Sequence, residues 1–316
     1  MQRQTVLTGL GAALALPLAG IRSARAADTV TLRVGNVPID SSSEIFAAQS
    51  QGFLAKAGIA VDIQSFTNGN AIAAAVVSGA LDIGGVNVLS LASAHEKGLP
   101  LKIVGSGATY TTKNPTTVML VPTASPLKVA RDLNGKTVAV NVLQGIAHVS
   151  AESWIDKNGG DSKLVKFIEL PFAAMPAALA ASRVDAAVVA EPQLTQSRAE
   201  TRLFGKSYDG IADLWMIDAW VANDAWINGN PELARRFSEA MRQAAVWANR
   251  NHDKTAEFVS AATKIDISVV RAMRRATFLE HVNLAVVQPV IDVGAQFGAL
   301  NARFPAADLF YPGALH

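Results

Sequence analysis

The sequence predicts an α/β protein made of two doubly wound lobes, and three observations support this fold class. Short apolar strands alternate with helices from Val30 to Val104, an order typical of a parallel sheet with helices on both faces. The stretch Leu81–Val86 is short and mostly apolar, as expected of a parallel strand that is covered on both sides. A weaker repeat at 176–189 again gives an alanine-rich helix, a serine turn, an aspartate and a buried strand, which suggests one such unit in each lobe.

The first region alternates strand and helix in strict order. A capping box formed by Ser41 and Glu44 starts the helix at 45–54, and Gly79 suits the left-handed position after the helix at 71–77. In doubly wound sheets ligands lie at the carboxyl ends of the strands, where loops meet helix N-termini. Three loops therefore qualify as ligand loops: 40–43, 67–70 and 86–90.

The alternation resumes after a polar crossover at 109–115. Strands are predicted at 117–121, 137–141, 167–171 and in the repeat that ends at Glu191-Pro192. This second segment spans about 105 residues, which is enough for an independent domain. Residues 215–222 look like a return crossing, and a helix with an apolar stripe runs from Pro231 to Asn249. Further helices are predicted around 255–264, 266–278 and 284–300, and they fit best as packing on the first lobe.

Residues 1–26 are predicted to be a secretory signal peptide. Arg3 precedes an uncharged run from Gln4 to Ile21, and small residues in an A-x-A frame follow at Ala24 and Ala26. The alternative is a transmembrane anchor, since the run approaches the ~20 residues needed to span a bilayer. Pro17 and the small-residue exit favour cleavage, so we expect an exported protein without a stable membrane anchor.

Composition excludes several functional classes. Removing the predicted signal peptide, with its three arginines, changes the formal net charge from +2 to −1. One tight basic cluster remains in the sequence, Arg271, Arg274 and Arg275, and it is more simply interpreted as a solvated helix face. A nucleic-acid partner is therefore not expected. The absence of cysteine excludes a lipidated cysteine, cysteine-ligated zinc, iron–sulfur clusters and thiol catalysis.

With these elements in place, the chain resembles the periplasmic substrate-binding proteins of ABC importers over essentially its whole mature length. The branch is the nitrate/sulfonate/taurine group, which also contains the thiamine-pyrimidine-precursor proteins. The order and spacing of several motifs together carry the resemblance: 51–61 (QGFLAKAGIAV), 78–84 (SGALDIG), 98–104 (GLPLKIV), 133–140 (LNGKTVAV), 184–187 (VDAA), 191–192 (EP) and 230–233 (NPEL).

The resemblance implies a fold of the type II periplasmic binding proteins, with two lobes joined by two hinge crossings and a ligand cleft between them. The first lobe would be discontinuous, comprising residues 27–112 and 220–316, and the second would comprise residues 113–219. Hinge closure around the ligand is the expected conformational step. The resemblance also implies a periplasmic location and a permease partner, and we expect a monomer with no cofactor and no bound metal.

One departure from the family pattern concerns the start of the predicted second-lobe helix. The family often has Gly-Ser-x-x-His there, with the serine hydroxyl and the helix N–H groups holding an anionic head group. This chain has Gln144-Gly145-Ile146-Ala147-His148, so a glycine replaces the serine. The free N–H groups and the helix dipole still suit an anion, but one hydroxyl donor is missing.

Candidate ligand residues of the first lobe come from the three ligand loops. Ser41 and Ser42 could donate to a ligand or could only cap a helix. The helix-entry loop and the loop after the buried strand could contact a ligand or form structural turns, and their candidates are Asn68, Gly69, Asn70 and Asn87.

In the second lobe, Gln144 and Gly145 are candidates because a helix N-terminus should face the cleft there. Glu191 could meet a ligand amine, as in related taurine-type proteins, or could make a hinge hydrogen bond. Trp220, like Trp215, could stack on an apolar part of the ligand or could pack in the core. His148 is interpreted as part of the helix entry rather than as a metal ligand.

These features favour a solute receptor that binds a small anionic or amphipathic molecule, of the organosulfonate or aromatic acid class, and delivers it to an ABC importer. The alternative is an enzyme on the same fold related to thiamine-pyrimidine synthesis, whose cysteine-rich iron motif a cysteine-free chain cannot supply. No Ser-His-Asp spacing, HExxH or phosphate loop is present in the sequence, so we expect no catalytic activity. A transcription regulator of the same fold would need a helix-turn-helix domain.

Overall fold

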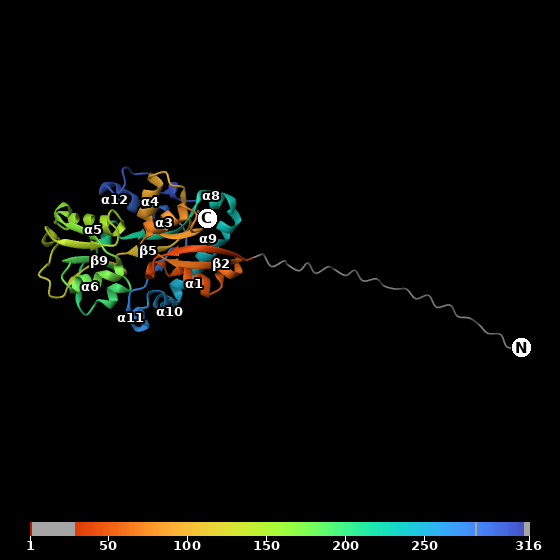
Figure 1. Ribbon diagram of the computed structural model, residues 1–316, viewed down its shortest axis with the longest axis horizontal. Helices are drawn as coiled ribbons and strands as arrows, with labels where there is room; N and C mark the ends of the chain where they lie inside the picture. Colours follow the sequence, from red (N-terminus) through yellow and green to blue (C-terminus); the bar gives the residue numbers. More distant parts are fainter. Residues whose placement is uncertain (2–28, 282, 313–316) are drawn as a thin grey trace.

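The computed structural model describes Met1 and residues 29–281 and 283–312 (Figure 1). The predicted signal peptide, apart from Met1, lies outside the described residues. Among the described helices, none combines the length and the apolar character that crossing a membrane requires.

The first five-stranded sheet has the order β2-β1-β3-β12-β4. Strands β1 (Val30–Asn36), β2 (Ile59–Ser65) and β3 (Ile83–Asn87) pair in parallel, whereas β12 (Asp218–Asn223) runs antiparallel between β3 and β4 (Leu101–Ser106). The prediction of a parallel sheet is therefore correct except for β12, which enters from the return crossing in the opposite direction.

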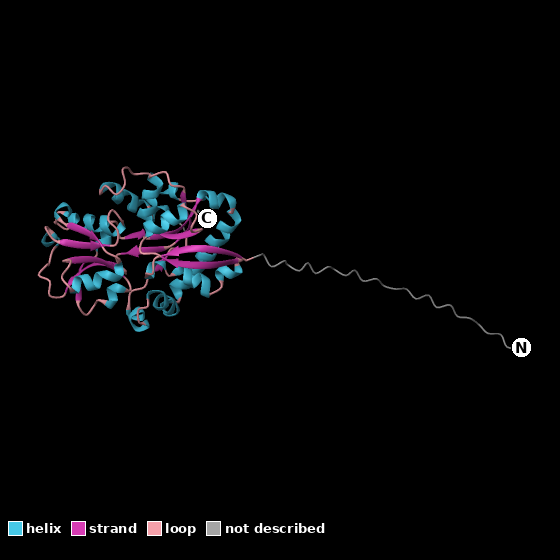
Figure 2. Ribbon diagram, in the orientation of Figure 1, coloured by secondary structure: helices cyan, strands magenta, loops and turns pink. Residues whose placement is uncertain are grey.

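Helices cover both faces of this sheet, as its apolar strands require (Figure 2). One face packs on α1 (Glu44–Ser50), α2 (Phe53–Lys56) and α9 (Pro231–Arg250), with Leu32, Ile83 and Phe237 in the shared core. The other face packs on α3 (Gly69–Val77) and α4 (Val88–Glu96), with Ile72 and Leu89 in the core. The short helix α8 (Asp224–Gly229) follows β12.

The second five-stranded sheet has the order β10-β6-β9-β7-β8. Strands β7 (Thr137–Val140), β8 (Lys166–Glu169) and β9 (Ala186–Ala190) are parallel, and β6 (Thr117–Pro122) pairs antiparallel with both β9 and β10 (Thr201–Gly205). The helices of this region are α5 (Ile146–Lys157), α6 (Met175–Ala180) and α7 (Gln193–Gln196).

A small antiparallel sheet lies where the chain passes between the two larger sheets (Figure 1). It joins β5 (Ala108–Thr111), β11 (Leu214–Met216) and β13 (Thr277–Phe278). The predicted return crossing at 215–222 is thus divided into β11, which pairs with the outgoing chain, and β12, which enters the first sheet. The predicted lobe boundaries at 112/113 and 219/220 stay a prediction.

The C-terminal helices correct one expectation. They were expected to pack on the first lobe, yet α12 (Gln288–Gln296) contacts both α4 and α5, and α11 (Ile267–Ala272) contacts α7 beside the second sheet. Helix α10 (His252–Thr263) packs on α1 and α9. The C-terminal segment therefore bridges the two sheets, because its apolar side chains are shared between helices of both.

A buried ion pair ties this segment to the first ligand loop. Asp40 begins the 3₁₀ helix η1 (Asp40–Ser42), and its Oδ1 lies 2.8 Å from the guanidinium of Arg275; the two side chains are only 1% and 8% exposed. The backbone N–H of Ala276 donates to Asp40 Oδ2, and Arg275 also donates to Thr255 Oγ1 at 2.9 Å. The backbone N–H of Asp40 in turn donates to the carbonyl of Glu191 at 3.3 Å, a contact between the two halves of the molecule.

We predict that Arg275→Ala lowers the free energy of unfolding by about 3 kcal/mol or more, because it leaves the Asp40 carboxylate buried without its partner. The measurement is urea denaturation followed by circular dichroism. Arg235→Ala, which removes the exposed ion pair with Glu232, is the control and should shift the midpoint little. Equal shifts in the two variants would contradict a structural role of the buried pair.

Candidate ligand-binding site

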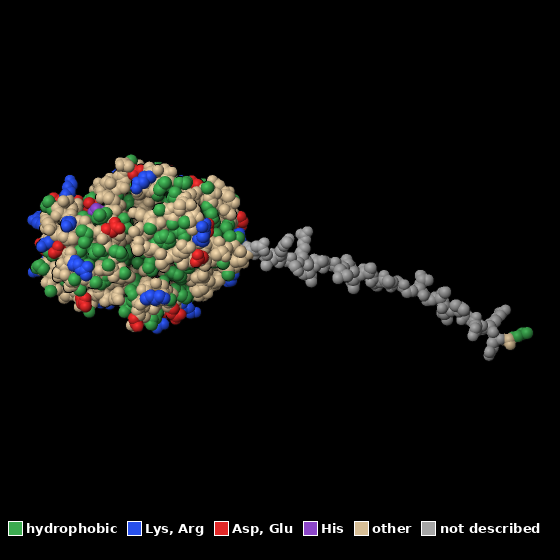
Figure 3. All heavy atoms as spheres, in the orientation of Figure 1, with side chains coloured by type: hydrophobic (Ala, Val, Ile, Leu, Met, Phe, Trp, Pro, Cys, Tyr) green, Lys and Arg blue, Asp and Glu red, His purple; other side chains and the backbone are tan. Residues whose placement is uncertain are grey.

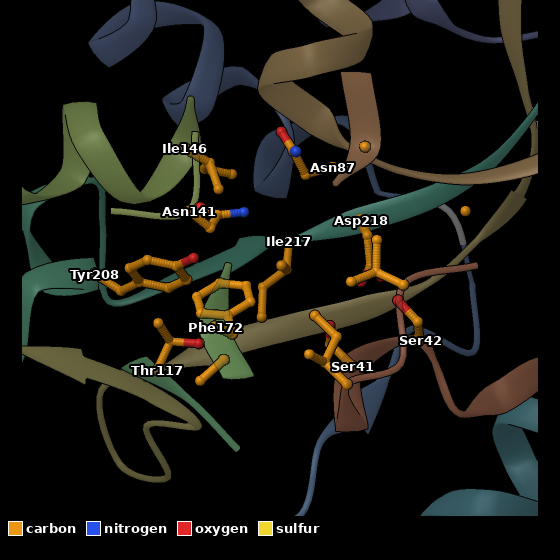
Figure 4. A pocket seen from close by; sticks show the side chains of 15 residues that line it. Ser41, Ser42, Asn87, Thr117, Asn141, Ile146, Phe172, Tyr208, Ile217 and Asp218 are labelled. Carbon is orange, nitrogen blue, oxygen red and sulfur yellow. The ribbon is translucent and has the colours of Figure 1, made fainter. Parts of the chain in front are cut away.

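A cavity lies between the two larger sheets at the carboxyl ends of their parallel strands, the place predicted for a ligand. Its volume is about 50 Å³, counted as space open to the centre of a water-sized sphere, which is enough for several waters or a compact polar group. The first-sheet side of its wall includes Val37, Ser41, Ser42, Gly69 and Asn87. The second-sheet side and the crossings supply Thr117, Asn141, Ile146, Phe172, Tyr208 and Asp218 (Figure 4).

Three helices begin at this cavity. Gly69 is the first residue of α3, Asn87 is the N-cap of α4, and Ile146 is the first residue of α5. The Asn87 side chain satisfies one terminal N–H of its helix, since its Oδ1 accepts from Ser90 at 2.9 Å. Because the positive ends of three helix dipoles converge here, the cavity has a favourable potential for a negatively charged group.

An acid lies beside the N-terminus of α4, since Asp218 is the cross-strand neighbour of Asn87. Asp218, at the start of β12, accepts the backbone N–H of Ala108 through Oδ1 at 2.8 Å. Burial raises the pKa of Asp218 to about 7. Hydrogen bonds to its carboxylate lower this pKa, first from the backbone N–H of Ala108 and then from the hydroxyls of Ser41 and Ser42. Figure 4 shows these two serines beside the aspartate on one side of the cavity.

A second buried acid lies behind Asp218. Glu44, the first residue of α1, accepts the indole N–H of Trp220 through Oε2 at 2.9 Å. Its Oε1 has no hydrogen-bond partner among the described residues. Burial raises the pKa of Glu44 well above its usual value, the Trp220 hydrogen bond opposes this, and the neighbouring Asp218 raises it further.

No lysine, arginine or histidine belongs to the described wall of the cavity. Tyr208, which is buried, keeps its hydroxyl proton because burial raises its pKa. An anion in this cavity would therefore be held by N–H groups, hydroxyls, amides and helix dipoles rather than by a cationic side chain.

An apolar cavity of about 140 Å³ adjoins the first and shares Val37, Ile39 and Phe172 with it. Phe66, which follows β2, lies on its first-sheet side, and Pro171 lies on its second-sheet side. Together the two cavities form a site with a polar inner part and an apolar outer part. Such a combination is typical of sites for small organic ligands.

The structure brings four of the predicted ligand residues to the cavity: Ser41, Ser42, Gly69 and Asn87. The other first-lobe candidates lie nearby without lining it. Asn68 caps α3 by accepting from Ala71 at 3.0 Å, and Asn70 is exposed.

The remaining four candidates also lie outside the cavity wall. Gln144 is exposed, and its backbone N–H donates to His148 Nδ1 at 2.9 Å. Gly145 is the N-cap of α5. The carboxylate of Glu191 accepts from the backbone N–H and hydroxyl of Thr195, both at 3.0 Å. Trp220 lies in the core against Phe237, with ring centroids 6.4 Å apart.

Trp215 is likewise a core residue. It is fully buried, and its indole N–H donates to the carbonyl of Tyr208 at 3.2 Å. The two tryptophans are buried because they lie on crossing strands that are covered on both sides. Their hydrogen bonds to Glu44 and Tyr208 satisfy the indole N–H groups inside the protein.

Sequence reasoning missed several wall residues. Asn141 could have been found, because it ends a predicted strand just as Asn87 does. Asp218 is a lone acid within the apolar run WMIDAW, and a buried acid in such a run is a signal for function. Tyr208, Thr117 and Phe172 carried no comparable signal.

The local backbone explains the glycine at position 145. A Cβ atom there would lie 2.9 Å from Val142 Cβ and 3.0 Å from the Val142 carbonyl oxygen. The serine found at this place in the resembling family would therefore clash in this chain.

His148 has a structural role at this helix entry. It is buried, accepts the Gln144 N–H, and lies edge-on to Phe167 with ring centroids 4.2 Å apart. Burial lowers its pKa to about 4, so it is neutral at pH 7. Within the described part of the chain, no group of three or more His, Cys, Asp or Glu side chains is arranged to hold a metal ion.

Comparison with known proteins gives one family and many structures. The sequence model of the family described as NMT1/THI5 like matches residues 41–255. No curated protein matches the sequence.

Three of the similar structures show the range of relatives. The alkanesulfonate-binding protein SsuA from Xanthomonas axonopodis pv. citri, bound to MOPS, is 20% identical over 90% of this chain and 99% of its own, with a TM-score of 0.75. The nitrate-binding protein NrtA from Synechocystis PCC 6803 is 16% identical over 91% of this chain and 87% of its own, with a TM-score of 0.74. A DszB mutant in complex with biphenyl-2-sulfinic acid is 16% identical over 90% of this chain and 97% of its own, with a TM-score of 0.65.

The raised pKa of Asp218 predicts a pH-dependent contribution to stability. The folded protein holds this proton more tightly than the unfolded chain does, so the stabilisation is complete below pH 3.8 and is lost as the pH rises through about 7. Relative to Asp218→Asn, the wild-type free energy of unfolding should fall by up to ~4 kcal/mol between about pH 4 and about pH 8.

Urea denaturation across this pH range measures that difference, with Asp62→Asn at an exposed position of β2 as the control for removing a surface charge. A difference between wild type and Asp218→Asn that stays constant with pH would contradict the assignment.

We also predict that Gly145→Ala destabilises the protein by about 1–3 kcal/mol, because the new methyl group meets Val142 on a rigid helix entry. Thermal unfolding measures the effect. Gly229→Ala is the matched control, since a Cβ there has no neighbour within 4 Å among the described residues and should cause no loss. An unchanged melting temperature in the first variant would show that the helix entry can relax.

Proposed function

The chain belongs to the NMT1/THI5-like family, and from this we propose that it is a solute receptor that binds a small organic molecule between its lobes and delivers it to an ABC importer. The predicted family resemblance and the predicted two-lobed fold of periplasmic binding proteins are both confirmed. The observation that carries the proposal is the cavity between the two sheets, whose wall is drawn from both.

The wall also supports binding over catalysis. It offers hydroxyls, amides and the carboxyl group of Asp218, and the described lining includes no histidine, lysine or cysteine. An enzyme acting in this cavity would have to use Asp218 as its acid or base. SsuA and NrtA, which share the fold, are named as binding proteins.

We propose an anionic or amphipathic ligand, of the organosulfonate or aromatic acid class. The converging N-termini of α3, α4 and α5 suit an acid group, and the apolar cavity beside Phe66 and Phe172 suits a hydrocarbon or aromatic part. SsuA was found with MOPS and DszB with biphenyl-2-sulfinic acid, and both of these compounds combine the two features.

The location and the partner follow from the same proposal. Export to the periplasm rests on the predicted signal peptide, and the permease partner rests on the family. Closure about β5 and β11 would enclose the ligand, and the Asp40–Glu191 backbone contact would help to hold the closed form. Charged side chains of both signs are interspersed on the face in Figure 3, as in a soluble exported receptor.

We expect at least one compound from a panel of sulfonates, carboxylates, nitrate and pyrimidines to raise the melting temperature of the mature protein. Calorimetry should then give one bound molecule per chain, and mass spectrometry should recover the compound unchanged. A changed compound would favour the enzyme alternative, and no binding from the whole panel would contradict the ligand class.

Asn141→Leu should weaken that binding about tenfold. The side chain lines the cavity, and its Oδ1 has no partner among the described residues, so it is free to pair with a ligand. Asn158→Leu, the same change at the exposed C-cap of α5, is the control and should leave affinity unchanged. Equal affinity in the two variants would place the ligand elsewhere.

A further inference from the structure

A further cavity, of about 270 Å³ counted in the same way, lies on the second sheet apart from the candidate ligand-binding site. It is built on β6 and β10 and shares no lining residue with the two cavities of that site. Thr117 lines the cavity between the sheets, whereas the next residue, Val118, lines this one. Because successive side chains of a strand point to opposite faces, the two cavities lie toward different faces of β6.

Three arginines line this cavity, which we call the arginine cavity: Arg198, Arg202 and Arg274. Arg198 follows α7, Arg202 lies in β10, and Arg274 follows α11, which contacts α7 beside the second sheet (Figure 1). Within the described chain, none of the three guanidinium groups forms an ion pair with a carboxylate. The cavity therefore collects positive charge that the protein itself does not neutralise by direct pairing.

Two of these guanidinium groups have N–H donors to spare. Arg202 is engaged elsewhere, since it donates to two backbone carbonyls of the loop after β6. Arg198 makes one side-chain hydrogen bond in the described chain, to Thr195 Oγ1 at 3.2 Å, and Arg274 makes one of 3.5 Å, to the carbonyl of Pro115. A guanidinium carries five N–H donors in a planar fork that matches carboxylate and phosphate oxygens, so Arg198 and Arg274 can hold an oxyanion.

The basic cluster at 271–275 is divided between three environments. Its interpretation as one solvated helix face is correct for Arg271, which is exposed on α11, but that helix ends at Ala272. Arg275 is buried against Asp40, so that interpretation is wrong for it, and Arg274 lines the arginine cavity. Because its neighbour Arg275 is anchored by the buried ion pair, the backbone of Arg274 is held in place beside the cavity.

The wall contains one carboxyl group, that of Glu191, and its oxygens are already engaged. They accept from the backbone N–H and the hydroxyl of Thr195, both at 3.0 Å. Burial raises the pKa of Glu191 to about 7, so this group carries less than a full negative charge near neutral pH. The cavity therefore favours an anion over a cation.

The rest of the wall is largely apolar. Val118 and Leu120 come from β6, Leu194 comes from α7, and Leu203 comes from β10. Leu203 is 52% exposed, so its apolar surface is open to a ligand. Apolar walls with a few convergent polar groups are typical of sites for small organic ligands.

We propose that the arginine cavity is a second binding site, for a small organic oxyanion with a carboxylate or phosphate head group. The head group lies between Arg198 and Arg274, and the apolar body lies against Leu194 and Leu203. Since Arg198 belongs to the second half and Arg274 to the C-terminal segment, the bound anion joins these two parts of the molecule. This inference goes beyond the proposed receptor function and does not depend on it.

The test uses phenyl phosphate and benzoate as probes, with benzyl alcohol as the uncharged analogue. Phenylglyoxal, which modifies arginine side chains, reports the site when the modified peptides are measured by mass spectrometry. Either anion should slow the modification of Arg198 and Arg274 at least threefold and leave Arg271 unaffected, whereas benzyl alcohol should protect none of them. Stronger protection by phenyl phosphate would identify a phosphate head group, and stronger protection by benzoate a carboxylate.

Arg198→Ala and Arg274→Ala should each weaken the protecting anion about tenfold in calorimetry, because each removes one charged donor group. Both side chains are exposed, so the fold should be retained, and circular dichroism checks this. Arg271→Ala is the matched control, since it removes the same charge one helical turn away without touching the cavity. Asn141→Leu weakens any binding between the sheets and should leave the protection of the two arginines unchanged.

Protection of Arg198 and Arg274 together, with loss of affinity in their variants and not in Arg271→Ala, would support the second site. Absence of protection by both anions at millimolar concentration would overturn it, as would equal protection by benzyl alcohol. Protection of the two arginines that disappears in Asn141→Leu would also overturn it, because the anion would then act from the cavity between the sheets. None of these results bears on the receptor function, which the ligand panel tests separately.

Discussion

The insertion of β12 between β3 and β4 is the constraint on which the rest of the structure depends. A strand that pairs on both edges satisfies its backbone groups within the sheet, so it is held firmly in place. Because side chains alternate along a strand, Asp218 and Trp220 share one face of β12. That face meets Glu44 at the start of α1, and the same strand therefore supplies one wall of the cavity and part of the core.

The chemistry of the cavity follows from this insertion, which places Asp218 beside Asn87 at the N-terminus of α4. The parallel strands end at the N-termini of α3, α4 and α5, which gives positive potential without any cationic side chain. The antiparallel strand β12 begins at the same place and brings an acid. Burial raises the pKa of Asp218 to about 7 and also raises the pKa of Glu44, so the charge of the site changes with pH.

The C-terminal segment stabilises the arrangement from outside the sheets. Helix α12 packs on α4 and α5, and Arg275 forms its buried ion pair with Asp40 beside the first ligand loop. The contacts of α12 with α4 and α5 join the two halves, as does the contact of α11 with α7 beside the second sheet. Any opening movement must therefore work against packing that the simple picture of two lobes and two crossings does not include.

The sequence by itself determined the alternation of strands and helices, the helix start at Asn68, and the family, because these follow from local periodicity, capping chemistry and ordered motifs. It also indicated Ser41, Ser42, Gly69 and Asn87, since the ends of parallel strands always meet at one edge of a sheet. Only the tertiary structure decided that Trp220 packs inside, that α12 bridges both halves, and that Asp218, Asn141 and Tyr208 face one cavity. These placements depend on contacts between segments far apart in the chain, whose side chains meet only once the strand order is fixed.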